Sequence, residues 1–376
     1  MSDKTGTRKY PLNQIYFYLT EGCNLRCRHC WIAPKYQSEK KSYPALDLDL
    51  LKSIIEQAKP LGLTGVKLTG GEPLLHPEIE GILEYVRAQY LRLTVETNGV
   101  LCTGELAEKM AACKDPFVSV SLDGADSGTH EWVRGVGGCF DQAIDGLRNL
   151  ISAGLRPQVI MTVMRHNKDQ MEPMVRVAEN LGAGSVKFNI LQPTARGESM
   201  HANGEALAIE ELVDLGKWVE NTLSAATVLN LYYDHPIAFQ PLGKMFGQNG
   251  DGCGTCGISG ILGVLADGSY ALCGIGEKVH DLVFGHASKD ILEYVWTNTS
   301  VLQEIREELP HKLEGICGQC LMKEICLGSC LAQNYYRSKS LWKPFWFCDE
   351  AYNQGLFPET RIPPKKSKHS MTEEKG

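Results

Sequence analysis

The sequence predicts an α/β fold built around a parallel sheet, and two observations predict it. Between residue 14 and about residue 190, six short apolar segments alternate with amphipathic helical patterns, as βαβ units do. Polar or glycine-rich clusters follow four of these segments, where parallel folds place their functional groups. Units of this kind form either a doubly wound sheet or an incomplete barrel, joined by right-handed crossovers.

The first part of the chain supplies the strands and helices of this sheet. Each expected strand is a short apolar run, and each expected helix repeats apolar residues at helical spacing. We expect strands at residues 15–20, 65–69, 91–97, 117–122, 158–163 and 185–190, and helices at 48–59, 77–90, 104–113, 140–153 and 170–181.

The polar clusters stand where the expected strands end. Cys23 follows the first strand and Gly70-Gly71-Glu72-Pro73 follows the second. Asn98-Gly99 follows the third strand, and Asp123-Gly124 follows the fourth. Because parallel strands end at one edge of a sheet, these clusters predict an active site at that edge.

The second part of the chain is less regular. A helix is expected at 210–223, and residues 260–266 and 269–273 form a hairpin around an Asp267-Gly268 turn. We expect the charged end to be disordered. The domain boundaries that follow are an amino-terminal extension at 1–13, the barrel at 14–225, a linker at 226–252, a smaller α+β cysteine-rich domain at 253–362 and a tail at 363–376.

Composition narrows the class of protein. A net charge of −7 argues against nucleic-acid binding, and no apolar run is long enough to span a membrane. The polar amino terminus lacks the apolar core of a signal peptide, so we expect a cytoplasmic location. In a reducing compartment, clustered cysteines bind metal more often than they form disulfides, and this chain has 14.

Eleven of the cysteines fall into two groups, and Cys102, Cys113 and Cys139 are expected to be buried as small hydrophobic residues. The first group is Cys23-x3-Cys27-x2-Cys30. Three thiolates can hold three irons of a cubane cluster and leave the fourth iron open to a cofactor. A zinc site that borrows His29 is the alternative, although zinc sites favour paired C-x2-C spacings.

At these residues the chain resembles the radical S-adenosylmethionine (SAM) superfamily, whose signature loop follows the first strand of a partial (β/α)6 barrel. The resemblance implies that the open iron binds the amino and carboxylate groups of SAM. It also implies that an electron from the cluster breaks a carbon–sulfur bond to give methionine and a 5′-deoxyadenosyl radical.

The resemblance implies roles for the other strand ends. Gly70, Gly71, Glu72 and Pro73 match the motif that binds the SAM amino group, and Asn98 matches a position near the ribose. The segment that carries Ser121, Asp123 and Arg134 resembles one that reaches the SAM carboxylate, and His29 takes the place of an aromatic residue near the adenine. No general base is identified.

The second cysteine group lies between residues 253 and 348 and resembles the SPASM domain, which holds two auxiliary clusters. C-x2-C pairs also occur in zinc ribbons, which are the alternative. The resemblance assigns Cys317, Cys320, Cys326 and Cys348 to an outer cluster. It assigns Cys273 and Cys330 to an inner one, with Cys253, Cys256 or both, and we expect both to bind. Three [4Fe–4S] clusters are therefore expected.

Enzymes with this domain pair mostly modify peptides or proteins. We therefore expect an oxidoreductase that cross-links a substrate peptide through a C–S or C–C bond, and needs an external donor of the flavodoxin or ferredoxin type. About thirteen residues precede the first strand, so leader binding would need a separate protein. Sulfatase maturases carry an acidic residue directly after the cysteine equivalent to Cys273, whereas Gly274 stands here and Glu277 is the first carboxylate downstream. The alternatives are cofactor or tetrapyrrole maturation and an iron–sulfur electron carrier.

Overall fold

The computed structural model describes residues 10–38, 41–246 and 256–364. Ten strands form one sheet in the order β12-β11-β10-β1-β4-β5-β6-β7-β8-β9. From β10 to β9 every neighbouring pair is parallel, and helices cover the outer side of the sheet. This is the parallel sheet of a partial barrel, so the predicted fold class is confirmed. The parallel strands are β10 (Ile261–Val264), β1 (Gln14–Tyr18), β4 (Gly65–Thr69), β5 (Arg92–Thr97), β6 (Lys114–Ser121), β7 (Gln158–Val163), β8 (Ser185–Ile190) and β9 (Asn230–Tyr233).

The helices of the barrel follow their strands as expected. α1 begins at an aspartate whose side chain caps it, because Asp47 accepts a hydrogen bond from the backbone of Leu50 at 2.8 Å. The barrel helices are α1 (Leu48–Ala58), α2 (Ile79–Ala88), α3 (Gly104–Ala111), α4 (Ser127–Arg134), α5 (Cys139–Ser152), α6 (Met171–Leu181), α7 (Arg196–Ala202) and α8 (Ile209–Trp218).

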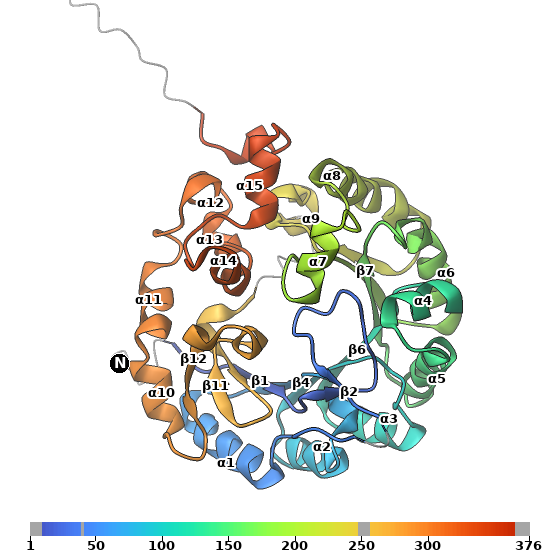
Figure 1. Cartoon of the computed structure of the whole chain (residues 1–376), viewed down its shortest axis with the longest axis vertical. Coiled ribbons are helices and arrows are strands. Elements are labelled where there is room, and N and C mark those ends of the chain that lie inside the picture. The colour runs from blue at the N-terminus through green and yellow to red at the C-terminus, as the bar shows by residue number, and fades with distance from the viewer. Residues whose placement is uncertain (1–9, 39–40, 247–255, 365–376) are drawn as a thin grey trace, which may run out of the picture.

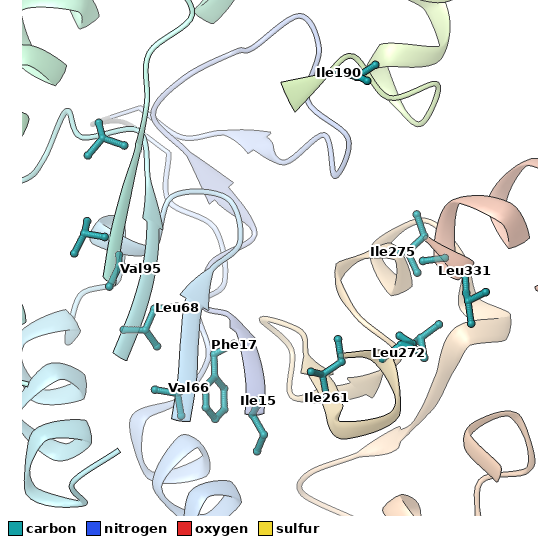
Figure 2. Close-up of a cluster of buried hydrophobic side chains, with 14 of the residues drawn as sticks. Ile15, Phe17, Val66, Leu68, Val95, Ile190, Ile261, Leu272, Ile275 and Leu331 are labelled. Atoms are coloured by element: carbon teal, nitrogen blue, oxygen red, sulfur yellow. The ribbon is translucent and has the colours of Figure 1, made fainter. Parts of the chain in front are cut away.

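The hydrophobic core lies on the outer side of the strands, the side that the helices cover. Ile15 and Phe17 of β1 lie beside Val66 and Leu68 of β4, and all four are fully buried (Figure 2). Burial of each such side chain stabilises the fold by about 1.5–3 kcal/mol. The alternate positions of the same strands face the interior, and several of them are polar.

The carboxyl-terminal region continues the sheet. β10 pairs with β1 in parallel, and β11 (Ser269–Ala271) and β12 (Val283–His286) follow it antiparallel. Gly268 has φ of +91° in the turn between β10 and β11, which confirms the predicted hairpin. Figure 1 shows the later elements, in orange and red, between α1 and α8. They are α10 (Leu292–Asn298), α11 (Ser300–Glu308), α12 (Gly315–Gln319), α13 (Lys323–Cys326), α14 (Leu331–Ser338) and α15 (Trp346–Asn353).

The interval 226–252, which we expected to be a linker, contains β9 and the short helix α9 (Leu242–Phe246). The sequence analysis missed β9 because this strand has only four residues. Only two of them, Leu231 and Tyr233, are buried, which is too short an apolar pattern to mark a strand. Residues 1–9, 247–255 and 365–376, and with them Cys253, lie outside the described residues. Within the described ranges, no helix is long and apolar enough to cross a membrane.

Candidate functional site

The first cysteine group lies on the loop that follows β1. Cys23 belongs to the short strand β2 (Gly22–Cys23), which pairs with β3 (Lys35–Tyr36), and Cys23 and Cys27 are buried around Leu25. Burial raises the pKa of the Cys23 thiol, and the neighbouring Cys27 and Cys30 raise it further. Burial also raises the pKa of Cys27, to about 11, although Arg134 opposes this shift. Thiolates gathered here need a cationic partner, and the irons of a cluster would be one.

Side chains that could hold a single metal ion do not converge here. Among the residues that the structure describes, no three His, Cys, Asp or Glu side chains form such a group. In a cubane cluster each cysteine binds a different iron, so the sulfurs surround a volume instead of a point.

The Gly-Gly-Glu-Pro motif at the end of β4 is tied to this loop. The backbone N–H of Gly71 donates to Thr20 O at 3.0 Å, and that of Glu72 donates to Gly22 O at 3.0 Å. A Cβ on Gly71 would overlap the Gly22 carbonyl group. The second glycine is therefore required because two backbones meet there.

The Glu72 carboxylate is enclosed by the protein. Its Oε1 accepts hydrogen bonds from Thr97 Oγ1 at 2.6 Å and from the Leu74 N–H at 3.1 Å, and its Oε2 accepts one from the Asn98 N–H at 2.8 Å. Only 1% of the residue is exposed, and burial raises its pKa while these donors oppose the shift. Glu72 therefore joins the ends of β4 and β5.

Asn98 connects the third strand end to the cysteine loop. Its Nδ2 donates to Asn24 Oδ1 at 2.8 Å and lies 3.9 Å from Cys23 Sγ. The backbone N–H of Leu25 also points to this sulfur, at 3.4 Å. Ser121 is half-buried at the end of β6, so the predicted ribose-side and carboxylate-side residues lie along one edge of the sheet.

The fourth strand end holds a buried ionic group. Asp123 Oδ2 lies 2.8 Å from Arg134 Nη2 and 3.6 Å from His29 Nε2. Burial alone would raise the pKa of Asp123, but Arg134 and His29 hold it below its usual range. Burial lowers the pKa of His29 to about 4, so this imidazole is neutral at pH 7. The structure thus places Arg134 and His29, predicted to meet SAM, against Asp123.

Three cysteines of the inner group lie together. Burial raises the pKa of the Cys273 thiol, and its neighbours Cys330 and Cys256 raise it further. Burial raises the pKa of Cys330 to about 12, and Cys256 contributes. Whether Cys253 joins them, as we predict, lies outside the described residues.

The outer group brings together the remaining four cysteines. A hydrogen bond from Cys348 lowers the pKa of Cys317. The pKa of Cys348 is raised by the same bond, by burial and by Cys317, Cys326 and Cys320. Backbone N–H groups also point to two sulfurs, from Phe345 to Cys317 at 3.4 Å and from Met322 to Cys320 at 3.3 Å. Such N–H···S contacts are typical of iron–sulfur sites.

The interior of the barrel is polar, which the sequence analysis missed. The Lys67 amine pairs with Glu96 and lies 4.8 Å from the centre of the Tyr16 ring. Lys187 Nζ lies 3.2 Å from Asp234 Oδ1, beside a cavity of about 350 Å³. The sequence does carry a sign of this polar interior, because polar residues recur at alternate positions of β1, β4, β5 and β8. Closed barrels fill such positions with branched apolar side chains.

A second cavity, of about 280 Å³, lies between the cysteine loop and the 3-10 helix Gly274–Glu277. Burial and the nearby Glu21 raise the pKa of Glu277 on its wall. Behind it, the Tyr18 ring packs against Gly274, where a Cβ would overlap the ring. The lining residues are Tyr18, Thr20, Glu21, Ile32, Ala33, Pro34, Lys35, Gly70, Gly71, Glu277 and Lys278.

The three isolated cysteines are buried, as predicted. Cys102 and Cys113 pack in the main core. Cys139 packs with Cys23, Leu25 and Cys27, so it borders the cysteine loop even though its spacing in the sequence gives no sign of this.

Comparison with known protein families identifies two regions. Residues 17–178 match the Radical SAM superfamily, and residues 253–321 match SPASM, an iron–sulfur cluster-binding domain. The chain is 30% identical over 331 residues to the AdoMet-dependent heme synthase of Methanosarcina barkeri, which covers 85% of this chain and 91% of that protein. It is 28% identical over 354 residues to the mycofactocin maturase MftC of Mycobacterium tuberculosis, which covers 94% of this chain and 87% of that protein.

Solved structures share the fold. Streptococcus suis SuiB bound to its precursor peptide SuiA superposes with a TM-score of 0.68 at 18% identity, over 90% of this chain and 76% of that one. Native anSMEcpe with bound AdoMet superposes with a TM-score of 0.67 at 17% identity, over 92% of this chain and 98% of that one.

Proposed function

Since this chain belongs to the radical SAM superfamily and carries a SPASM domain, it is a radical SAM enzyme, and we propose that it modifies a peptide or protein. The product we propose is an oxidative C–S or C–C cross-link. The observation that carries this proposal is the polar barrel interior, where Tyr16 and Lys67 lie near cysteines of the inner group.

The residues present fit three [4Fe–4S] clusters. Cys23, Cys27 and Cys30 would hold the cluster that binds SAM, and Cys317, Cys320, Cys326 and Cys348 would hold the outer one. Cys256, Cys273 and Cys330, with Cys253, would hold a closed inner cluster. When bound, the first cluster and SAM supply a carbon-centred radical at the carboxyl edge of the sheet.

One strand connects the two sites. Tyr16 and Tyr18 of β1 lie near Cys273, and the chain then runs directly into the cysteine loop. A substrate in the cavity beside Gly70 and Gly71 would therefore lie between the place where the radical forms and the inner group. Cys256, Cys273 and Cys330 would hold a cluster there, and such a cluster would supply an acceptor for the electron that an oxidative cross-link releases.

Charge favours a peptide as the occupant. Lys67, Glu96 and Lys187 offer both donors and acceptors inside the barrel, as a polar peptide requires. Glu277 is half-buried on the cavity wall, and no described side chain forms an ion pair with it within 4.0 Å. We assign it the task of accepting a hydrogen bond from a peptide N–H or a basic side chain of the substrate.

The partners follow from this chemistry. An external donor of the flavodoxin or ferredoxin type would reduce the first cluster, in a cytoplasmic setting. A separate protein would present the leader of the substrate if the substrate has one.

Maturation of a small cofactor or tetrapyrrole is the second candidate. The 30% identity to the Methanosarcina barkeri heme synthase favours it. A tetrapyrrole precursor is a large, flat ring that carries carboxylate side chains, but the amines of Lys67 and Lys187 are already paired with Glu96 and Asp234. The apolar faces of the ring would therefore suit this interior less well than a polar peptide.

The substrate class can be tested directly. The reconstituted enzyme, with SAM and a reductant, should convert a short peptide encoded beside its gene with loss of two hydrogens, measured by mass spectrometry. Glu277→Gln should raise KM for that peptide without changing SAM cleavage in its absence, because Glu277 contributes to binding alone. Conversion of a porphyrin precursor instead would contradict the peptide assignment.

A sulfatase-motif peptide should not be converted to formylglycine. The position after Cys273 holds Gly274, and the Tyr18 ring leaves no room there for an acidic side chain. Mass spectrometry of the incubated peptide measures this. Efficient conversion would overturn the prediction and make Glu277 or another group the base.

Iron content tests the number of clusters. Three cubane clusters require about 12 irons per chain after anaerobic reconstitution. Elemental analysis should find this amount with almost no zinc. About four irons together with bound zinc would show that the carboxyl-terminal cysteines form a zinc site.

A further inference from the structure

The Arg134 guanidinium lies between a carboxylate and a cysteine of the first group. Arg134 is the last residue of α4, which ends at Gly135 with φ of +73°. Its Nη2 lies 2.8 Å from Asp123 Oδ2, and its Nη1 lies 3.6 Å from Cys27 Sγ. With only 6% of the residue exposed, both arms of the guanidinium are used inside the protein.

Several contacts fix this position. Asp123 is fully buried, and its other oxygen accepts a hydrogen bond from the Thr162 N–H at 2.7 Å. The backbone of Asp123 donates to His130 Nδ1 at 3.1 Å and accepts from Asn167 Nδ2 at 2.9 Å. Asp123 therefore has little freedom to move, and it holds Arg134.

The backbone of α4 also holds the cysteine loop. Arg26 donates its N–H to Arg134 O at 2.9 Å, and Arg28 donates to Val133 O at 2.9 Å. A Cβ on Gly135 would lie 2.8 Å from Arg26 O, so the two segments touch. The backbone of Arg134 is thus attached to the cysteine loop, and its side chain reaches Cys27 from this fixed position.

A donor and a positive charge at a cysteine sulfur favour the reduced state of the cluster that this cysteine holds. Reduction adds one negative charge to the cluster, and hydrogen bonds to its sulfurs together with nearby charges set its potential. Arginine suits this position because it stays charged when buried.

We propose that Arg134 is a positioning residue that donates an N–H···S hydrogen bond to Cys27 and makes the first cluster easier to reduce. This inference rests on the proposed function, because it requires a cluster at Cys23, Cys27 and Cys30. It differs from the sequence prediction that Arg134 binds the SAM carboxylate. Asp123 is the anchor of Arg134 and opposes part of its charge.

The test is the potential of the SAM-free cluster, followed by EPR in a redox titration of the holoenzyme. Addition of SAM identifies the signal of the first cluster among the three. Arg134→Gln should lower the ratio of reduced to oxidised cluster at a fixed potential by about tenfold, which corresponds to about 59 mV for one electron. Arg134→Lys keeps the charge and should recover part of the loss.

One further variant sharpens the test. Arg148→Gln is the matched control, because Arg148 is exposed on α5, where its guanidinium pairs with Asp145. It should leave the potential unchanged.

The outcomes separate the alternatives. An unchanged potential in Arg134→Gln, with a raised KM for SAM, would overturn the proposal and support the carboxylate role. Loss of iron from both Arg134 variants, with wild-type circular dichroism, would also overturn it and make Arg134 a residue of loop assembly. A wild-type enzyme without any SAM-responsive signal would instead contradict the proposed function.

Discussion

Replacement of Cys23, Cys27 and Cys30 by alanine should abolish the reductive cleavage of SAM. The three thiols lie on one buried loop, and only a cluster held by three cysteines leaves an iron open to SAM. The carboxyl-terminal cysteines are separate from this loop, so about eight of 12 irons should remain after reconstitution. Release of 5′-deoxyadenosine, measured by chromatography, gives the cleavage rate.

A matched variant controls for the loss of buried thiols. Cys113→Ala removes a buried cysteine from the main core, next to the start of β6 and so at the other end of the sheet from the loop, and should leave both iron content and SAM cleavage at the wild-type level. If the triple variant still releases 5′-deoxyadenosine at the wild-type rate, the assignment of the first cluster is wrong.

Gly71→Ala should impair the same reaction without touching a cysteine. The new Cβ would overlap the Gly22 carbonyl group, next to Cys23, and the loop would have to move. Overpacking of this kind costs about 1–3 kcal/mol of stability. A shift of about 1 Å in a positioned group can reduce the rate about 100-fold, and we expect a loss of that order in SAM cleavage.

Gly104→Ala is the control for this variant. Gly104 begins α3, and a Cβ there would meet no atom within 4 Å. Alanine also favours a helix over glycine, so this variant should be as stable and as active as the wild type. If Gly71→Ala cleaved SAM at the wild-type rate, the prediction would be wrong, and the cysteine loop could move relative to the Gly-Gly-Glu-Pro motif without loss of activity.

The strands could be predicted from the sequence because apolar residues and turn residues mark their limits. β4, β7 and β8 lie at the predicted residues, and β1 and β5 differ by one or two residues at their ends. The same rules also find the strand ends that carry Cys23, Glu72, Asn98 and Asp123. Local sequence is sufficient for this level of the structure, since each strand is defined by its own residues.

Side-chain partners could not be predicted in the same way. Arg134 and Asp123 stand eleven positions apart in the sequence, and nothing local indicates that they pair or that Cys27 lies beside them. The enclosure of Glu72 depends on Thr97 and Asn98 of another strand. Lys67 and Glu96 look like surface charges until the barrel brings β4 and β5 together with both residues inside.

The pairing of β1 with β10 means that the sheet is completed only late in the synthesis of the chain. Gln14 is in register with Ile261, so the strand that leads to Cys23 finds its second neighbour only after most of the chain has been synthesised. Until then β1 is an edge strand, and an unpaired edge promotes aggregation. Contacts so distant in sequence also form slowly. We therefore expect a barrel truncated before β10 to aggregate and not to act as a smaller enzyme.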